Sequence, residues 1–553
     1  MSDLLLTQPA RPAVLDPAHV GDIQGALGTI AQGDLHPRRT WKARLTTLLA
    51  IVGPGLIVMV GDNDAGAFST YSQAGQNYGT ALLWTLLLLI PVLYVNQEMV
   101  LRLGAVTGVG HARLILERFG RFWGAFSVID LFLLNALTIV TEFIGINLAL
   151  GYLGVPRGWG IVVAAGIVIS AASTGSFRRF ERFSLALCFF SLLLVPVFVL
   201  AHPPASAIAQ GLFVPRFPAD GRLSDVMLLV IAIVGTTVAP WQLFFQQSYI
   251  IDKRITPRFM AYEKADLWIG IVFVMVGAIA MMAFTAAAFH GTAGYGHFTD
   301  AGAVATGLEA YAGRTAGVMF ALALLNASII GASAVSLSTA YAIGDVLSLR
   351  HSLHRRPTDA LGFYVVYAGL IAIAAALVVF GSDALLGLLT NAVQTLAGVL
   401  LPSATVFLLL LCNDRAVLGP WVNGRWLNLF TGAVIWVLVM LSVILTAATL
   451  FPDMSGTAIV GILAGGVAVG VVGSAVLALT RRERADGPAP ARTAAERERA
   501  RLVLATWRMP SLDRLPPAAM SRGRRLWMAL LRAYLVGAVV LVGVKVVQVA
   551  LSQ

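Results

Sequence analysis

The chain has 553 residues, of which 58% are hydrophobic and 12% are charged. Soluble globular domains carry about 25% charged residues, so this composition and the mean hydropathy of +0.81 exclude an ordinary soluble protein. The formal net charge of +11 is compatible with a nucleic-acid partner, but basic cytoplasmic loops also give such a charge to a membrane protein.

Long stretches of the chain, such as 81–95 and 159–172, are apolar on every face of a helix. Lipid-embedded helices have this pattern, whereas the strands of a β-barrel alternate. We therefore predict an all-α polytopic membrane protein. With about 20 apolar residues for each crossing, the sequence predicts 12–13 transmembrane spans, at 44–61 continuing to 77, 80–102, 123–152, 158–175, 183–201, 225–250, 265–289, 315–346, 361–380, 384–412, 427–450, 457–479 and 530–551.

The basic residues are concentrated on one side of this arrangement. If the N-terminus is cytosolic, the inner loops contain basic clusters at 38–44, 113–121, 178–182, 253–264, 350–356 and 415–425, and the outer loops contain Arg157, Arg216, Arg222 and Arg314. The positive-inside rule then predicts a multi-pass protein of the cytoplasmic (inner) membrane with a cytosolic N-terminus. The basic charge needs no nucleic acid to explain it.

The segments outside the spans are predicted from their composition. Residues 1–43 are polar, contain no apolar signal region and are predicted to be a disordered cytosolic tail. Residues 480–529 are rich in Ala, Arg, Glu and Pro, which favours a basic cytosolic linker, mainly a solvated spacer, before an additional helix at 530–551. The two cysteines, Cys188 and Cys412, lie in apolar runs and are expected to be packing residues.

Polar residues interrupt the first span in the middle of the membrane. The run Gly61-Asp62-Asn63-Asp64-Ala65-Gly66 places two carboxylates and an amide between glycines. An ionisable residue at this depth costs at least about 2.5–3.5 kcal/mol, so it is expected to face a cavity, a partner or an ion. A buried structural network with another helix is the alternative.

The sixth span contains a similar interruption at Ala239-Pro240-Trp241-Gln242. Proline removes a backbone donor and crowds the preceding turn, so this helix is also predicted to break. Two broken helices, each opening one half of a ten-helix unit, are typical of an inverted-repeat transporter with its site at the bilayer midplane. We predict repeats of five helices each at 44–201 and 224–412, followed by extra C-terminal helices at 427–479.

The residues around both breaks offer oxygen ligands. The candidate metal ligands are Asp62, Asn63, Asp64, Gln242, the carbonyl freed near Ala239 and, in the tenth span, Asn391 and Gln394. Neither break contains His or Cys, and Met59 lies about a turn away, so hard cations such as Ca²⁺, Mg²⁺ or Mn²⁺ are favoured. A sparse acidic site suits Mg²⁺, which keeps several of its waters.

Further motifs occur in a specific order along the first two spans. They are Gly53-Pro54-Gly55, Gln73-Ala74-Gly75, Tyr78-Gly79, Leu83-Trp84 and Arg102-Leu103-Gly104-Ala105-Val106-Thr107-Gly108. Their order and spacing resemble the Nramp family of divalent-metal transporters, over about residues 44–450. The resemblance implies the leucine-transporter-like fold of that family.

The same resemblance implies roles for individual residues. Asp64 matches the aspartate of the family's Asp-Pro-Gly-Asn metal motif, and Ala67 stands where that motif has asparagine. The run Ala239-Pro240-Trp241-Gln242 takes the place of Met-Pro-His-Asn in the sixth helix. Gln394 matches a glutamine of the tenth helix that approaches the ion in that family.

Three departures from the family pattern concern selectivity and coupling. Ala239 replaces a methionine whose sulfur favours transition metals, Trp241 replaces a histidine, and Ile139 stands where the family has a proton-carrying aspartate. Together they resemble the divergent branch of Nramp-related magnesium transporters. That branch implies a secondary transporter for Mg²⁺ and Mn²⁺ that is not tightly coupled to protons, with no cofactor and with the cation and the bilayer as partners.

Other interpretations stay open at this point. A proton-coupled Mn²⁺/Fe²⁺ symporter of Nramp type, an amino-acid transporter on the same fold and a channel-like uniporter are the alternatives. Glu142 of the third span could guide protons or cations, or it could pair with Asn135. An intramembrane enzyme would need a catalytic partner for Asp62 and Asp64, and because the sequence offers none we predict no enzyme.

Overall fold

The computed structural model describes most of the chain. It covers residues 13–34, 36–218, 221–382, 404–451, 454–482 and 502–518, together with residues 386, 393, 402, 498, 525, 528–533, 536–537 and 540. Within these residues, nine helices are long and apolar enough to cross a membrane, or ten if the bent pair at the start is one span.

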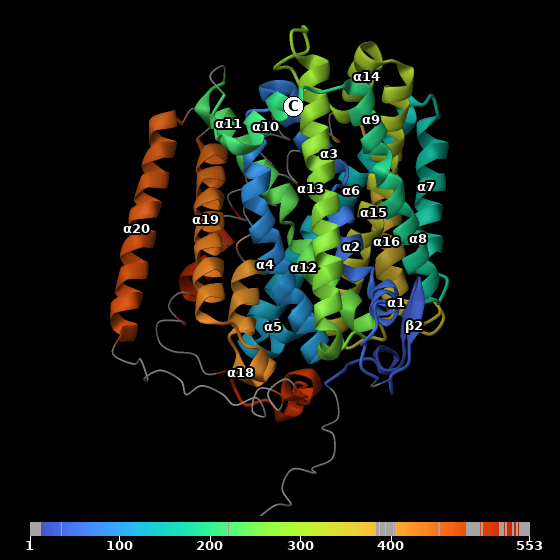
Figure 1. The fold of residues 1–553 in the computed structure, drawn as a ribbon, viewed down its shortest axis with the longest axis vertical. Coiled ribbons are helices and arrows are strands. Elements are labelled where there is room, and N and C mark those ends of the chain that lie inside the picture. Colours follow the sequence, from blue (N-terminus) through green and yellow to red (C-terminus); the bar gives the residue numbers. More distant parts are fainter. Residues whose placement is uncertain are drawn as a thin grey trace, which may run out of the picture.

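The structure is a bundle of long helices that run roughly parallel to its long axis (Figure 1). The helices are α1 Trp41–Ile51, α2 Pro54–Gly61, α3 Ala65–Tyr78, α4 Trp84–Thr107, α5 His111–Phe119, α6 Arg121–Tyr152, α7 Arg157–Ala172, α8 Phe177–Phe190, α9 Leu194–Ala201, α10 Ala205–Phe213, α11 Leu223–Thr237, α12 Pro240–Asp252, α13 Met260–Phe289, α14 Ala301–Ala312, α15 Arg314–Val346, α16 Leu361–Phe380, α18 Arg415–Leu418, α19 Arg425–Leu450 and α20 Gly456–Arg482. Short 3-10 turns lie at Pro17–His19, Ser191–Leu193, Pro257–Phe259, Gly419–Trp421 and Leu512–Arg514.

The all-α membrane fold is as predicted, and within the described residues one predicted span is not found. The predicted span at 158–175 corresponds to α7, which has 16 residues and is short for a complete crossing. The predicted spans at 384–412 and 530–551 lie largely outside the described residues. Eleven of the predicted spans therefore fall on described residues, and the structure has up to ten of them there, all except the one at α7.

Both predicted helix interruptions are present. The first helix bends by 49° between α1 and α2 and stops again at Asp62–Asp64 before α3. The second break, at Val238 and Ala239, separates α11 from α12. Prolines open the helices after two of these breaks, because the first turn of a helix does not need the missing N–H. Gly53 has φ +155°, a conformation that side chains rarely allow.

Glycines allow the broken first helix to pack directly against α13. A Cβ atom on Gly55 would lie 2.7 Å from the backbone of Leu267, and one on Gly270 would lie 2.6 Å from the Gly55 carbonyl oxygen. About four turns further along α13, a side chain on Gly75 of α3 would overlap Thr285. Small residues allow such close backbone contact between membrane helices, and here they fix where the Asp62–Asp64 break lies.

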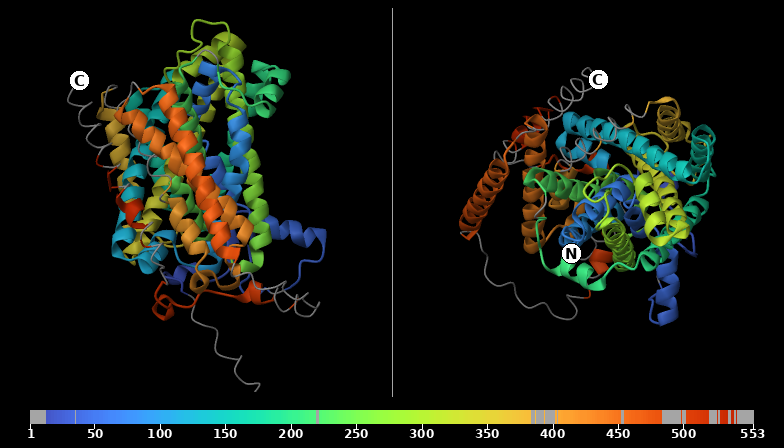
Figure 2. Two further views of the ribbon diagram at one scale, coloured as in Figure 1. Left: turned by 90° about the vertical axis from the view of Figure 1, so that its left-hand side faces the viewer. Right: turned by 90° about the horizontal axis from the view of Figure 1, so that it is seen from above.

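The N-terminal segment differs from the predicted disordered tail over residues 13–34. Strands β1 Ile23–Gly25 and β2 Gly28–Ile30 form an antiparallel hairpin, with Ile23 opposite Ile30. The hairpin lies at one end of the bundle, near which α1 projects sideways (Figures 1 and 2). Its order comes from tertiary contacts, because buried Asp16 accepts hydrogen bonds from Arg355 at 2.5 Å and from the N–H of His351 at 3.0 Å.

Part of the predicted C-terminal spacer is also docked. In residues 502–518, the N–H of Met509 donates to the Val106 carbonyl at 3.2 Å. Trp421 donates to the Leu504 carbonyl at 3.0 Å. This described part of the 480–529 linker therefore packs on the bundle rather than being solvated throughout.

The attachment of the N-terminal segment should weaken in mild alkali. Burial opposes protonation of His351, but the Asp345 carboxylate, 3.1 Å from its Nε2 atom, raises the pKa of this histidine to about 9. A raised pKa gives stability that is complete below the ordinary value of about 6.5 and is lost as the pH rises through about 9. We expect the Tm of the purified protein to fall between pH 7 and pH 9.5, and we expect His351→Gln to remove most of this fall. An equal fall in the variant would contradict the assignment.

Candidate functional site

The two helix breaks meet through Asp62 and Gln242. The Gln242 side chain, in the first turn of α12, donates from Nε2 to the Asp62 carboxylate at the end of α2. Its Oε1 atom accepts a hydrogen bond of 2.8 Å from Gln97 of α4. All three side chains are buried, so α4 and α12 together orient the carboxylate that follows α2.

Asp64 and Glu142 form the second half of this group. Asp64 caps α3, and its Oδ1 accepts the N–H of Ala67 at 2.9 Å. Glu142 of α6 accepts the N–H of Ala65 at 3.2 Å. Both acids meet at Gly331 of α15, where a Cβ atom would lie 2.8 Å from the Glu142 carboxyl and 3.0 Å from the Asp64 Cβ. The two carboxyl groups therefore approach each other beside the first break.

When they are ionised, these three acids place unbalanced negative charge inside the bundle. Among the described residues, none of the three is paired with a basic side chain, and one oxygen of Asp62 and one of Glu142 have no hydrogen-bond partner. Buried charge of one sign is costly unless a counter-ion or a proton balances it. The arrangement is therefore suited to hold a cation or to exchange protons for one.

In this structure, the carboxylates of Asp62, Asp64 and Glu142 do not form a closed coordination shell. In the described part of the chain, no three His, Cys, Asp or Glu side chains converge closely enough to hold a metal ion. The remaining ligands would have to come from amide or carbonyl oxygens, water, or a rearrangement of the breaks. Such sparse coordination is ordinary for a hard divalent cation that keeps its water.

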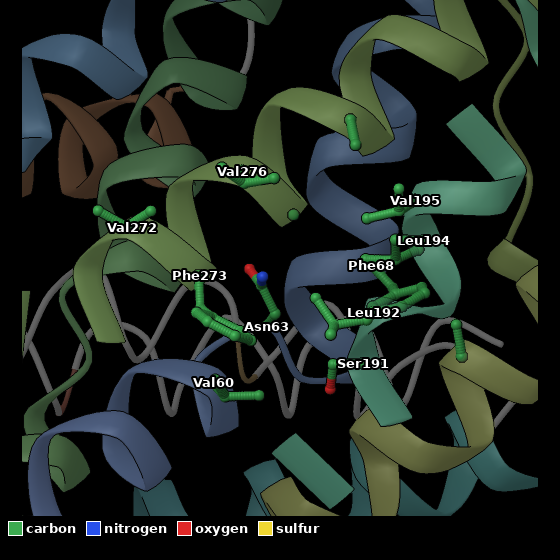
Figure 3. A pocket seen from close by; sticks show the side chains of 13 residues that line it. Val60, Asn63, Phe68, Ser191, Leu192, Leu194, Val195, Val272, Phe273 and Val276 are labelled. Carbon is green, nitrogen blue, oxygen red and sulfur yellow. The ribbon is translucent and has the colours of Figure 1, made fainter. Parts of the chain in front are cut away.

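Asn63 is turned away from the other two residues of its run. Its Nδ2 donates to the Val274 carbonyl of α13 at 3.1 Å, while its Oδ1 has no partner. The side chain borders a mostly apolar cavity of about 240 Å³, with Phe68 and Val276 among the lining residues (Figure 3). In this structure, Asn63 is therefore not grouped with Gln242 and the Asp62 carboxylate.

The predicted residues of the second break have specific contacts. Ala239 is the N-cap of α12, and its carbonyl accepts the N–H of Gln242 at 3.2 Å, so it is not the unoccupied acceptor that the sequence suggested. Trp241 is buried, and a Cβ atom on Gly61 would lie 3.5 Å from its ring. Its carbonyl accepts the Ser338 hydroxyl at 2.9 Å.

The remaining predicted positions are Ile139, Met59, Asn391 and Gln394. Ile139 is buried in α6, three residues before Glu142. The Met59 side chain packs on Gly270 of α13 rather than on Asp64. Asn391 and Gln394 lie outside the described residues.

The sequence interpretation missed residues that support the site. Gln97 aligns Gln242, and the Tyr71 hydroxyl of α3 lies 2.7 Å from the Thr237 hydroxyl of α11, which joins the two broken helices a second time. The polar run Asn96-Gln97-Glu98 inside an apolar helix was the available signal for Gln97. Gly331 gave no signal, because its role is only to leave room for two carboxyl groups.

Comparison with solved structures identifies the class of fold. The chain matches a manganese transporter of Eremococcus coleocola, solved with an aromatic bis-isothiourea substituted compound, with a TM-score of 0.61 and 21% identity over 83% of this chain and 97% of that one. It matches MhsT in complex with L-phenylalanine with a TM-score of 0.51 and 15% identity, over 74% and 99% of the two chains. The protein therefore has the leucine-transporter-like fold of a multi-pass membrane transporter.

Sequence comparison then gives the family. Residues 55–448 match the family described as natural resistance-associated macrophage protein-like (Nramp). A divalent metal cation transporter MntH of Ralstonia nicotianae is 30% identical over 413 residues, 71% of this chain and 88% of that protein. The MntH of Xylella fastidiosa strain 9a5c is 28% identical over 465 residues, 80% and 92% of the two chains. The chain belongs to the Nramp family, and it is a transporter rather than an enzyme.

The close approach at Gly331 can be tested by substitution. Gly331→Ala should destabilise the protein by about 1–3 kcal/mol, because the added Cβ overlaps the Glu142 carboxyl. Gly369→Ala is the matched control, since that glycine of α16 has open space around its Cβ position and alanine favours a helix. Thermal unfolding in detergent compares the two. If Gly331→Ala unfolds at the same temperature as Gly369→Ala, the two acids are not packed as described.

Proposed function

We propose that this protein transports divalent metal cations across the membrane by alternating access. The observation that carries the proposal is the group of buried acids at the first break, with Asp62 joined to Gln242 at the second. Discontinuous helices with midplane polar residues are the usual ion sites of this fold. The relatives named as divalent metal cation transporters support the same function.

In this proposal Asp64 is a direct ligand, and Asp62 binds the ion directly or through water. Gln242 and the second lone pair of the Ala239 carbonyl complete the side formed by α12. Asn63 and Gln394 remain proposed ligands, and Asn63 would first have to leave the Val274 carbonyl. Ala67, Trp241 and Ile139 shape the site without supplying a charged ligand. A different conformation of the two breaks would bring these groups together around the ion.

Mn²⁺ is the substrate that the comparisons favour, since a similar solved structure is named a manganese transporter. No comparison supports the magnesium-transporting branch. Mg²⁺ remains the second candidate on one observation: Ala239 supplies no sulfur, and Met59 packs on α13 instead, so the site consists of oxygen atoms. Oxygen ligands do not discriminate against Mg²⁺ as a thioether does.

The same residues bear on whether metal transport is coupled to proton movement. Trp241 and Ile139 cannot carry a proton, whereas Asp62, Asp64 and Glu142 can. The membership of the Nramp family favours the alternative of a proton-coupled symporter, and the two uncharged positions favour weak coupling. A pH-sensitive dye inside liposomes distinguishes these cases, because a symporter acidifies the lumen in proportion to metal uptake.

We also propose that the hairpin end of the bundle faces the cytoplasm. This end contains the basic residues Arg113 of α5, Arg178 at the start of α8 and Arg355 of the loop before α16. The positive-inside rule assigns such basic ends to the cytoplasmic side of a cytoplasmic membrane.

Asp64→Asn should abolish uptake of Mn²⁺ and Mg²⁺ into liposomes. Asparagine is also a good helix N-cap, so the substitution removes the charge while α3 keeps its cap. Asp62→Asn should raise the apparent KM more than it lowers the maximal rate.

Asp300→Asn is the matched control for Asp64→Asn. Asp300 caps α14 in the same way, accepting the N–H of Ala303 at 2.8 Å, and it lies outside the site. Uptake at the wild-type rate in folded Asp64→Asn would remove Asp64 from the site.

Ala239→Met should shift selectivity toward softer ions. A thioether at the N-cap of α12 adds attraction for Mn²⁺ and Cd²⁺ but none for Mg²⁺. We expect Cd²⁺ to compete with Mn²⁺ uptake about tenfold more strongly, and Mg²⁺ to compete less. Ala232→Met, at a half-buried position in α11, controls for bulk. A competition series that matches the wild type would show that Ala239 is not beside the ion.

A further inference from the structure

The N-terminal segment 13–34 connects the ends of both broken helices at one end of the bundle. On one side, its hairpin rests on α1 just before the first bend. A Cβ atom on Gly28 would lie 2.9 Å from the Ala50 Cβ, and one on Gly25 would overlap the Ala50 carbonyl. The hairpin backbone is therefore in direct contact with the last turn of α1.

On the other side, the segment is bound to the end of α12. Arg254, which follows that helix, donates to the Ala18 carbonyl at 2.9 Å and to the Asp22 carbonyl at 3.0 Å. His19 lies 3.5 Å from the buried carboxylate of Asp252, the last residue of α12. Since Gln242 of the site lies in the first turn of α12, the segment holds the far end of a helix that takes part in the site.

Glu181 of α8 joins these two attachments. One of its carboxylate oxygens accepts the N–H of Ala26 in the hairpin turn at 2.6 Å, and the other binds the Lys253 ammonium at 2.7 Å. Lys253 in turn donates to the carbonyls of Ile51 and Val52 at 2.5 and 2.9 Å. Glu181 and Lys253 are completely buried, so removing either partner leaves an unpaired charge.

The bend between α1 and α2 is thus held from two directions. Lys253 binds the carbonyls that α1 leaves free, while Asp266 of α13 accepts the N–H groups of Gly53 and Gly55 at 3.2 and 2.7 Å. The hairpin lies over this bend, outside residues 55–448 that match the family.

We propose that residues 13–34 act as a clamp that keeps this end of the transporter closed, and that Glu181 is the positioning residue that transmits the clamp to the first bend. This inference rests on the proposed function for its purpose, but its geometry is independent of the transported ion. Opening at this end requires α1 and α2 to separate from α12, and the clamp ties them together.

Cysteine accessibility tests the clamp. Ser338→Cys introduces a thiol of similar size on α15 at a buried position, where the serine hydroxyl contacts Trp241 of α12. Both natural cysteines are buried and set a low background. Gly61 at the end of α2 also faces Trp241, so the rate of maleimide labelling of purified protein in detergent reports how often α2 separates from α12 and exposes this region.

Gly25→Ala, added to Ser338→Cys, should raise this rate about tenfold, because the new methyl group pushes the hairpin off α1 and overpacking shifts a two-state equilibrium by this order. Gly33→Ala is the matched control, since the same change in the same segment meets no atom within 4 Å. Glu181→Gln should also raise the rate, because it removes the charge opposite Lys253 but keeps the size of the side chain.

A second reporter separates release of the clamp from general loosening. Ala305→Cys is buried in α14, at the end of the bundle opposite the hairpin (Figure 1). Its labelling rate should stay unchanged in Gly25→Ala and Glu181→Gln. Equal increases at both reporters would mean that the substitutions only destabilise the fold, and would overturn the clamp.

The other possible results of these experiments test the clamp and the proposed function separately. If Gly25→Ala is not recovered as folded protein, Glu181→Gln alone carries the test, and labelling at the parent rate overturns the proposal. A parent protein that transports Mn²⁺ while both variants label at the parent rate refutes the clamp and leaves the proposed function standing. A parent that transports no divalent ion but shows the expected labelling pattern refutes the function and supports the clamp.

Discussion

The structure depends on the placement of charged groups where two helices are broken inside a membrane. A break leaves backbone groups without helical partners, and Asp62 and Asp64 add negative charge at the same depth. The surrounding residues stabilise these exposed backbone groups and carboxylates. Gln97 and Gln242 orient the Asp62 carboxylate, and Gly331 leaves room for the Glu142 carboxyl. The N–H groups of Ala65 and Ala67 donate to Glu142 and Asp64. Burying these acids inside the membrane costs free energy, and the same acids are the groups available to bind a cation.

The neighbouring bend in the first helix is handled differently. Lys253, Glu181 and Asp266 supply charges of both signs and satisfy the carbonyl and N–H groups around Gly53. The acids at this bend share the buried ammonium group of Lys253, whereas the Asp62–Asp64 centre has no basic partner among the described residues. The two centres therefore differ in whether the protein itself supplies a cation.

Much of the fold followed from local sequence, and much of the site did not. Helices of all-apolar residues and breaks at Asp62 and Pro240 are dictated by hydration and by the missing proline N–H, so they could be predicted. The hairpin could not, because Asp16 and Arg355 are far apart in sequence and the polar composition resembles a disordered tail. The direction of Asn63 was equally hidden, since neighbouring residues at a helix break point to different sides and only packing against Val274 selects one.

The glycine contacts between α13 and the first helix limit how this protein can move. Where Gly55 meets Gly270, no layer of side chains separates the two backbones, so there are no ridges that could slide past each other or exchange rotamers. The helices α2 and α13 are consequently a single mechanical element. Between this element and α9 there is free space of about 240 Å³, lined by residues of α2, α13 and α9. If α2 and α13 move together, this cavity should therefore shrink or grow, and the turns of α9 that line it should yield first.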